Sequence, residues 1–453
     1  MEPKFPEFVT YAIPVFFLLI FIELIYGVVK GRKLYRLNDS IADLGTGVLN
    51  RLFGLLSASA SVAVYWLVYD HLRLFDLPAQ PSWEWGMVLT FSACFVLYDL
   101  AYYWAHRMSH EINFLWATHV VHHQSEEYNL TVALRQSAFG GLVTWPFYLP
   151  LALLGFHPAV MLANGALSLI YQFWIHTRAI KRMGFLESFM NTPSHHRVHH
   201  GKNPKYLDRN HAGTFIIWDK MFGTFQEEEE EPVYGTVQPF KSFNPFWANL
   251  HYWKEMWDVA VRAPRFKDKI LIWFKHPGWR PAELGGSKEA PELDAKTYKK
   301  FDVTVPLPLS IYSLVWFAAI TAFTLICLFK VQAGILNLWQ IGGISAVATF
   351  SLICVGGILE GKRWARILEP LRLVGIAAFA VAAVGRTEWL ADLTPNLYWA
   401  YGVVAATAIS LLVVMKFRTT FTLTTADYES ETMHLEPGKP SSLAEPAMAS
   451  RVA

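Results

Sequence analysis

Histidine is the residue type whose number and spacing first suggest chemistry in this sequence. The chain has 453 residues and 16 histidines, and 11 of these lie between His106 and His200, where an even spread would place about three. Residues three and four apart share one face of a helix, so short histidine motifs can present their rings together. Three such motifs, HRMSH, HVVHH and HRVHH, contain His106, His110, His119, His122, His123, His196, His199 and His200.

Clustered imidazoles predict a transition-metal site. Neutral imidazole is a common ligand for zinc, iron, copper and nickel, whereas Mg²⁺ and Ca²⁺ prefer oxygen ligands. The eight motif histidines exceed the three or four protein ligands of a mononuclear zinc site. Without a metal the rings would also repel one another on protonation. The sequence therefore predicts two metal ions held by the three motifs.

The remaining histidines have more varied expected roles. His176 ends an apolar stretch and is expected to be a further ligand, because a histidine at that depth needs a partner. His195 adjoins HRVHH but lies on another helix face, so a ring-supporting role and a surface position are both open. His211, in RNHAGTF, is open between a ligand and a loop residue. Structural or solvated roles are expected for His157, His251, His276 and His434.

Carboxylates near the motifs are candidates for orienting the rings, since a metal-bound histidine usually donates its other N–H to a carboxylate or carbonyl. Asp99, seven residues before His106, is the first candidate, although an aspartate at a membrane interface can also be merely hydrated. Glu111 adjoins His110. Asp208 and Asp219 flank the third motif on a polar stretch.

The composition indicates a membrane protein. Hydrophobic residues make up 53% and charged residues 17% of the chain, against about 25% charged in soluble proteins, and the mean hydropathy is +0.26. A formal net charge of +2 gives no case for a nucleic-acid partner. The three cysteines lie in apolar runs and are expected to be buried thiols without a disulfide framework.

Several apolar stretches are long enough to cross a bilayer, which takes about 20 helical residues. They cover residues 8–29, 44–69, 85–104, 307–329, 334–359, 367–384 and 397–415. Two shorter stretches, starting at Gly141 and Pro158, are expected to form a membrane hairpin that does not fully cross.

These stretches predict four parts of the chain. Residues 1–176 form a membrane block with the first two motifs, 177–302 a polar region that completes the di-metal site, 303–416 a four-helix membrane block, and 417–453 a disordered tail. Lys and Arg residues next to the spans fall on one side of the membrane in this arrangement, and cytoplasmic flanks are enriched in these residues. The predicted fold class is therefore an all-α, polytopic integral membrane protein with a cytoplasm-facing, histidine-rich di-metal domain.

Two stretches carry a family resemblance: HRMSHEINFLWATHVVHHQSEEYNLTVALRQS from His106, and NTPSHHRVHHGKNPKYLDRNHAGTFIIWDKMFGTF from Asn191. The chain resembles the fatty acid hydroxylase and sterol desaturase superfamily of membrane di-iron enzymes. Within that superfamily it is most similar to the alkylglycerol monooxygenases, the tetrahydrobiopterin-dependent enzymes that cleave ether lipids. The resemblance extends beyond the metal motifs, into EEYNLTVALRQS and IIWDKMFGTF.

This resemblance implies that the eight motif histidines bind two irons, with zinc a possible substitute in isolated protein, and that Glu111 is functionally important. Asp99 is the second residue for which we expect a catalytic or supporting role. Fatty acid 2-hydroxylases have a further HxxxH pair, whereas here Ile180 stands four residues after His176, so the number of ligands stays open. The implied reductant is tetrahydrobiopterin, for which no residue pattern identifies a pocket.

The implied reaction is O₂-dependent hydroxylation of the carbon next to an ether oxygen, whose hemiacetal product collapses to a fatty aldehyde and a glycerol derivative. An apolar slot among the first spans would hold the alkyl tail. Trp116, Tyr128 and Trp218 are candidates for its mouth or for interfacial anchors.

Other functions stay open at this point. The same metal site could hydroxylate or desaturate a sterol, a sphingolipid or another lipid. A transition-metal transporter would place ligands near the membrane midplane, whereas these motifs lie in polar segments beside the spans. An inactive scaffold is disfavoured by the complete set of motif histidines. The expected location is the endoplasmic reticulum for a eukaryotic chain and the inner membrane for a bacterial one, and the oligomeric state is open.

Overall fold

The protein is helical throughout the part of the chain that the computed structural model describes, residues 8–287, 290–383 and 397–423. Extended pairing in these ranges is limited to two isolated bridges, Gly201↔Tyr234 and Lys362↔Leu423. The predicted all-α fold class is therefore confirmed. In chain order the helices are α1 (Phe8–Val29), α2 (Leu37–Leu72), α3 (Trp85–Glu111), α4 (Asn113–His123), α5 (Leu130–Ala133), α6 (Gly140–Thr144), η1 (Trp145–Tyr148), α7 (Leu149–Leu153), α8 (Pro158–Trp174), η2 (Gly184–Ser188), α9 (Pro193–His199), η3 (Pro204–Tyr206), α10 (Ile217–Phe222), α11 (Pro245–Arg262), α12 (Phe266–Phe274), η4 (Ala282–Leu284), α13 (Leu307–Gln332), α14 (Leu338–Leu359), α15 (Ala365–Ala383), α16 (Leu397–Lys416) and η5 (Arg418–Thr420).

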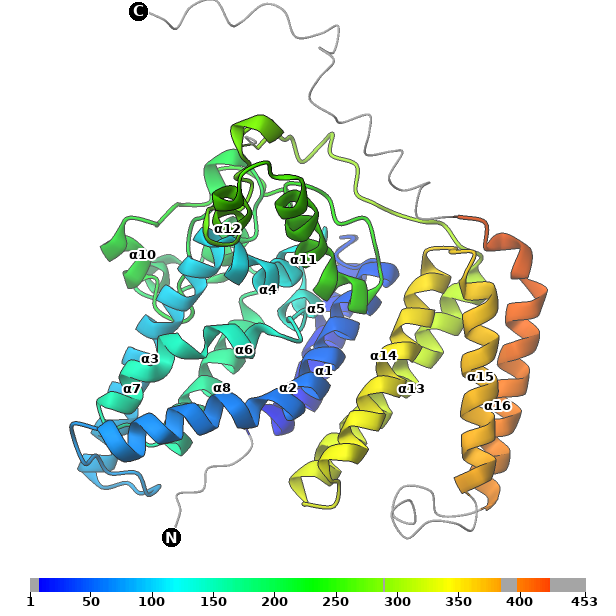
Figure 1. The fold of residues 1–453 in the computed structure, drawn as a ribbon, viewed down its shortest axis with the longest axis horizontal. Helices are drawn as coiled ribbons and strands as arrows, with labels where there is room; N and C mark the ends of the chain where they lie inside the picture. Colours follow the sequence, from blue (N-terminus) through cyan, green and yellow to red (C-terminus); the bar gives the residue numbers. More distant parts are fainter. Residues whose placement is uncertain (1–7, 288–289, 384–396, 424–453) are drawn as a thin grey trace, which may run out of the picture. The chain divides into compact units, whose positions relative to one another are not determined.

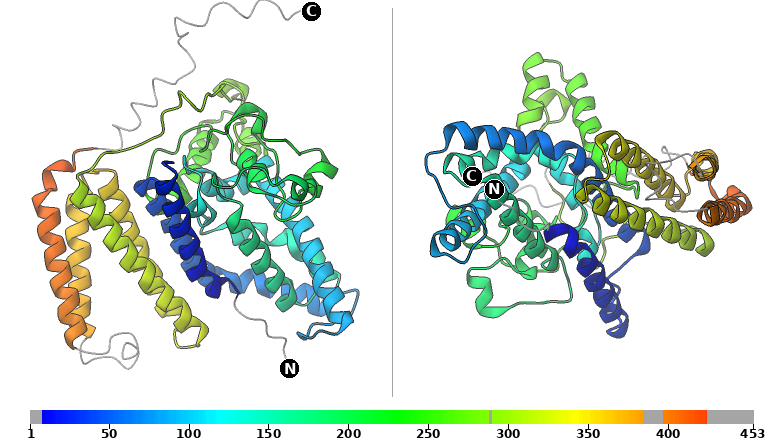
Figure 2. Two further views of the ribbon diagram at one scale, coloured as in Figure 1. Left: turned by 180° about the vertical axis from the view of Figure 1, so that it is seen from behind. Right: turned by 90° about the horizontal axis from the view of Figure 1, so that it is seen from below.

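The chain separates into two compact units. Unit 1 comprises residues up to 302 together with 310–356, and unit 2 comprises 303–309 and the residues from 357 onward. Unit 1 contains all three histidine motifs, and α10, α11 and α12 gather at the end of this unit where α3 passes into α4 (Figure 1). In unit 2, α15 and α16 run side by side (Figure 2). The domain boundaries expected at residues 176, 302 and 416 stay predictions.

Within the described residues, four helices are long and apolar enough to cross a membrane: α1, α3, α13 and α14. Helix α2 adds a fifth candidate as two segments, Leu37–Ser57 and Ala60–Leu72, bent by 48°. These helices confirm the expectation of an integral membrane protein. The side of the membrane on which the motifs lie stays a prediction.

The other apolar stretches form shorter elements. The stretch after Gly140 is divided into α6, η1 and α7, with Pro146 and Pro150 at the starts of the latter two, because proline cannot donate a helical hydrogen bond. Helix α8 has 17 residues, fewer than a straight span needs. In α15 the paired charges of Glu369 and Arg372 lower the hydropathy, and this helix is not among the span candidates. From residue 424 onward, the predicted tail lies outside the residues that the structure describes.

The turn between α3 and α4 is fixed by α11 and α12. The Asn113 side chain donates to the Ile272 carbonyl at 2.7 Å, and the Asn113 N–H donates to the Lys275 carbonyl at 2.9 Å. The Tyr252 hydroxyl donates to the Asn113 amide oxygen at 2.6 Å. Because a buried amide needs its partners, these bonds set the angle at which HRMSH and HVVHH face each other.

Candidate metal centre

The nine histidines expected as ligands converge in two groups within the described residues. In each group one ring nitrogen per residue lies within 4.8 Å of the others, and only His119 is more than slightly exposed. His176, expected from its depth alone, is a member of the second group. The first group is His106, His110, His119, His123 and His199, and the second is His122, His176, His196 and His200.

The helical period explains how each HxxHH motif divides between the groups. Successive residues of an α-helix turn by about 100°, so the rings at i and i+4 point in similar directions and the ring at i+3 points elsewhere. In HVVHH the outer pair joins the first group, and His122 joins the second. In HRVHH the outer pair joins the second group, and His199 joins the first. Each HxxHH motif therefore contributes to both groups, whereas both histidines of HRMSH belong to the first.

Backbone carbonyls hold several rings with the same nitrogen facing inward. The Nδ1–H groups of His122 and His176 donate to the carbonyls of Arg135 and Gln172, at 2.9 and 2.7 Å. Their Nε2 atoms consequently carry lone pairs, yet these atoms lie only 3.2 Å apart. Two facing lone pairs repel each other unless a cation lies between or beside them. The chemistry of this donor set fits a metal ion.

The first group shows the same arrangement. His106 and His199 donate through Nδ1 to the carbonyls of His211 and Arg209, at 2.7 and 3.0 Å. The Nε2 atoms of His110 and His199 are buried and have no hydrogen-bond partner among the described residues. Buried ring nitrogens without partners are rare in native proteins, so these atoms also fit a metal ion.

Electrostatics favour the neutral form of several of the rings, which is the form that binds a metal. Burial lowers the pKa of His119, His196 and His200 well below the usual value, and the neighbouring histidines lower it further. Neutral imidazole is a borderline ligand that suits iron, zinc and copper better than Mg²⁺ or Ca²⁺.

Arg135 is a site residue that the motif analysis missed. Its guanidinium donates to the Val121 carbonyl at 2.7 Å, to Gln124 Oε1 at 2.5 Å and to Asp43 Oδ1 at 3.1 Å. Its carbonyl accepts the His122 hydrogen bond, so the arginine joins α2 to the end of the HVVHH helix. The available signal was a lone cation inside the apolar stretch LTVALRQS, because a buried charge requires a partner.

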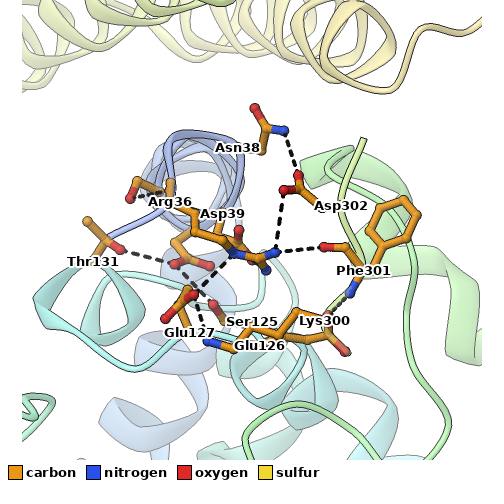
Figure 3. Close-up of polar contacts among 12 residues, drawn as sticks. Arg36, Asn38, Asp39, Ser125, Glu126, Glu127, Thr131, Lys300, Phe301 and Asp302 are labelled. Carbon is orange, nitrogen blue, oxygen red and sulfur yellow. Dashed lines mark hydrogen bonds and ion pairs between the residues drawn. The ribbon is translucent and has the colours of Figure 1, made fainter. Parts of the chain in front are cut away.

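Charged residues fasten the loop after HVVHH (Figure 3). Glu127 is buried and pairs with three cations, Arg36 at 3.1 Å, Arg178 at 2.9 Å and Lys300 at 2.6 Å. Glu126 accepts hydrogen bonds from the Tyr298 hydroxyl and, at 2.5 Å, from the Phe301 N–H. The two carboxylates of EEYN thus hold segment 298–302 against the loop that follows HVVHH.

Asp208 supports the first group directly. Its Oδ1 lies 3.4 Å from His110 Nδ1, and its Oδ2 lies 3.0 Å from His276 Nε2. Burial alone would raise the pKa of Asp208, but the hydrogen bonds with these two histidines hold that pKa below its usual range. The residue has a φ of 57°, a left-handed conformation that aspartate and asparagine tolerate better than most residues.

Asp99 orients a loop and makes no direct hydrogen bond to His106. Its carboxylate accepts from the backbone N–H groups of residues 214–215 at 2.7 and 2.9 Å, and from Trp218 Nε1 at 2.9 Å. These three donors occupy the carboxylate, which is why the ring support expected from it comes instead from the His211 carbonyl in the same loop. Trp218 is accordingly part of this buried network.

Asp219 fastens the other side of that loop. It accepts hydrogen bonds from the N–H groups of His211 and Ala212, both at 2.8 Å, and from the Thr224 hydroxyl at 2.6 Å. Burial raises the pKa of Asp219 to about 6. The carbonyl that orients His106 is therefore fixed by two buried aspartates.

Glu111 lies apart from the two groups. It pairs with Arg107 one turn earlier, at 2.8 Å, and its side chain is 37% exposed. No ring of the two groups bonds to it among the described residues, so its predicted catalytic role stays a prediction.

The remaining histidines have distinct surroundings. His195 packs against Phe225 with ring centroids 5.4 Å apart and lies outside both groups. His211 is fully buried, its ring centroid is 5.0 Å from that of His110, and both its ring nitrogens lack a hydrogen-bond partner in the described chain. His157 caps α8, and His251 bonds to Gln124, as expected of structural residues, whereas His276 pairs with Asp208. His434 lies outside the described residues.

Comparison with known proteins agrees with this geometry. The fatty acid hydroxylase family model matches residues 91–224, the segment that holds every histidine of both groups. Human alkylglycerol monooxygenase is 38% identical over 410 residues, which cover 89% of this chain and 88% of the relative. The chain belongs to the alkylglycerol monooxygenase family. It is thus an oxidoreductase of lipid metabolism.

Two further members of the family match over most of their length. The alkylglycerol monooxygenase of Xenopus tropicalis is 38% identical, over 81% of this chain and 80% of the relative. The alkylglycerol monooxygenase of Danio rerio is 36% identical, over 82% of this chain and 81% of the relative. No solved structure matches the chain.

Proposed function

We propose that the chain hydroxylates the carbon next to the ether oxygen of alkylglycerol lipids with O₂. The hemiacetal formed in this way collapses without further catalysis to a fatty aldehyde and a glycerol derivative. The convergence of nine imidazoles in two adjacent, largely buried groups carries the proposal, together with membership of the alkylglycerol monooxygenase family.

Two iron ions are the proposed metals, one held by each histidine group. Iron bound by imidazoles supplies O₂ activation. The first group offers five rings and the second four. Zinc binds the same donor type and can occupy the site in isolated protein.

The chain's own residues exclude water and hold the rings. His122, His176 and His196 are buried, so bulk water is kept from the reacting atoms. Trp116 packs against His110 and His123, with ring centroids 4.9 and 5.4 Å apart, and is proposed to contact the lipid. An apolar slot among the first spans is proposed to hold the alkyl tail.

The lipid is proposed to enter from the bilayer, since α3 is a span candidate and carries HRMSH at its end. Lys30, Arg32 and Lys33 follow α1, and such basic flanks favour the cytoplasmic side. We therefore place the histidine groups at the cytoplasmic surface, of the endoplasmic reticulum in a eukaryote or of the inner membrane in a bacterium. Tetrahydrobiopterin is the proposed reductant.

The test is product analysis with purified, iron-loaded protein. Labelled alkylglycerol, tetrahydrobiopterin and O₂ are expected to give labelled fatty aldehyde, with ¹⁸O₂ labelling the hydroxyl of the trapped hemiacetal. His199→Ala is expected to abolish the product, whereas His195→Ala, its matched control outside the groups, retains most of it. Elemental analysis with Mössbauer spectroscopy is expected to find two irons per chain. Absence of aldehyde from fully loaded protein contradicts the proposal.

A further inference from the structure

Glu23 is a buried carboxylate in the first candidate span, α1. Most of this helix is exposed or half-buried, and its buried residues are Phe16, Glu23 and Gly27. These residues are seven and four positions apart, so they share one face of the helix. Glu23 is only 5% exposed. A carboxylate within an apolar span is costly and is expected where it has a function beyond anchoring the chain.

The buried face of α1 lies against two segments that support the second histidine group. Phe16 stacks on Phe173 of α8, with ring centroids 4.1 Å apart, and shares a buried cluster with residues of α5. Helix α8 ends two residues before His176. Helix α5 ends two residues before Arg135, whose carbonyl accepts the hydrogen bond from His122. Both segments therefore lead directly to a ring of the second group.

The Glu23 carboxylate accepts hydrogen bonds from both of these segments. Its Oε2 accepts from the Leu130 N–H at 2.9 Å and from the Tyr35 hydroxyl, and its Oε1 accepts from the Thr177 hydroxyl. Leu130 begins α5, and Thr177 directly follows His176. One side chain of α1 thus joins the two segments to each other.

The third histidine motif holds Thr177 from another side. The Thr177 carbonyl accepts from Arg197 Nη1 at 3.0 Å. Arg197 directly follows His196, whose Nε2 lies 2.9 Å from that of His176. The residue after His176 is therefore bound both to α1, through Glu23, and to α9, which carries HRVHH.

We propose that Glu23 is a positioning residue of the second histidine group, holding the segments of His122 and His176 at the spacing that lets both rings bind one metal ion. The inference rests on the proposed metal binding. Glu23 acts through α5 and Thr177 and is not itself a ligand. Within the described chain, no hydrogen bond joins α1 to a ring of the first group. Only the second group is therefore expected to depend on Glu23.

Paired substitutions separate hydrogen bonding from packing. Glu23→Leu leaves three donors without an acceptor, whereas Glu23→Gln keeps an oxygen toward Leu130 and Tyr35 and an amide that can donate to Thr177. Thr177→Val removes the hydroxyl at similar shape, and Thr177→Ser keeps it. Tyr35→Phe is the matched control, because it removes one bond to the carboxylate from a residue outside the two ring-bearing segments.

A chelator titration of the iron-loaded full chain in detergent, followed by Mössbauer spectroscopy, measures the two irons separately. Glu23→Leu and Thr177→Val are each expected to lose the iron of the second group at a chelator concentration about tenfold lower than the wild type, as for a residue behind a metal ligand. His176→Ala identifies the signal of that iron. The first group's signal is expected to be unchanged, and Glu23→Gln, Thr177→Ser and Tyr35→Phe are expected to keep both signals.

The outcomes distinguish positioning from general stability. Equal weakening of both irons in Glu23→Leu and Thr177→Val indicates general destabilisation and overturns the inference, as does an unchanged second iron in either variant. If Glu23→Leu does not fold, Thr177→Val decides.

The same measurement separates this inference from the proposed function, because it needs neither lipid nor O₂. A chain that shows the expected iron losses but gives no aldehyde from alkylglycerol supports the inference and overturns the proposed reaction. A wild-type chain that gives aldehyde, with a second iron that is indifferent to Glu23 and Thr177, overturns the inference alone. A wild-type chain that binds fewer than two metal ions overturns both.

Discussion

Replacing Asp208 by asparagine is expected to weaken metal binding at the first histidine group and to leave the second unchanged. The carboxylate lies 3.4 Å from His110 Nδ1 and is the side chain that holds this ring. Asparagine tolerates the left-handed φ of 57° at this position, so the backbone keeps its course. The substitution removes the negative charge beside the His110 ring.

The magnitude follows from the role of the carboxylate. Mutation of a residue that supports a metal ligand from behind typically costs about 10–100-fold in metal affinity, which corresponds to about 1.4–2.8 kcal/mol. His122, His176 and His196 have no contact with Asp208, so the second group provides an internal reference.

The assay is a chelator titration of iron-loaded protein, followed by the iron that remains bound. For Asp208→Asn, half of the iron is expected to leave at a chelator concentration about 10–100-fold lower than the other half. His276→Asn, which removes the other partner of Asp208 but keeps the carboxylate beside His110, is the matched control. Equal weakening of both irons, or a curve identical to wild type, refutes this account of Asp208.

Three other expectations concern different parts of the site. His199→Ala is expected to remove iron from the first group and to abolish activity, whereas His195→Ala keeps both irons; metal analysis distinguishes them. Gly47→Ala is expected to lower the thermal stability and iron content together, because its Cβ would lie 2.5 Å from the Leu134 carbonyl oxygen beside Arg135. Asp219 has a raised folded pKa of about 6, so its contribution to stability is greatest at low pH and falls as the pH rises from about 4 to 6. The melting temperature of wild type relative to Asp219→Asn in detergent is expected to fall over that interval and to stay level above it; a rise would contradict the sign.

The clustering of the histidines could be predicted in part from the sequence, because helix geometry brings the rings within each motif together; their role as ligands stays a prediction. His176 was predictable from burial, since a histidine within an apolar stretch needs a partner. The division between the groups follows from the 100° turn per residue, but which motif supplies the outer pair to which group depends on how α9 packs against α4, and this packing is a long-range property of the fold.

The support of the rings was less predictable. Asp208 was a candidate because it follows the third motif, yet it supports His110 of the first motif, nearly a hundred residues earlier, through a left-handed turn that no local pattern indicates. Asp99 was identified as a candidate by its helical register with His106, yet register does not reveal that nearby N–H groups will occupy a carboxylate first. Arg135 escaped notice because its role depends on Asp43, a residue of another helix.

The crossing of the two HxxHH motifs has an evolutionary consequence. Loss of HRVHH would take one ring from the first group and two from the second, and loss of HVVHH would take two from the first and one from the second. Neither motif is a module that carries one ion. A descendant of this chain that needed only a single metal could not arise by discarding a motif, and would have to substitute scattered histidines one at a time while both neighbouring helices stayed in place.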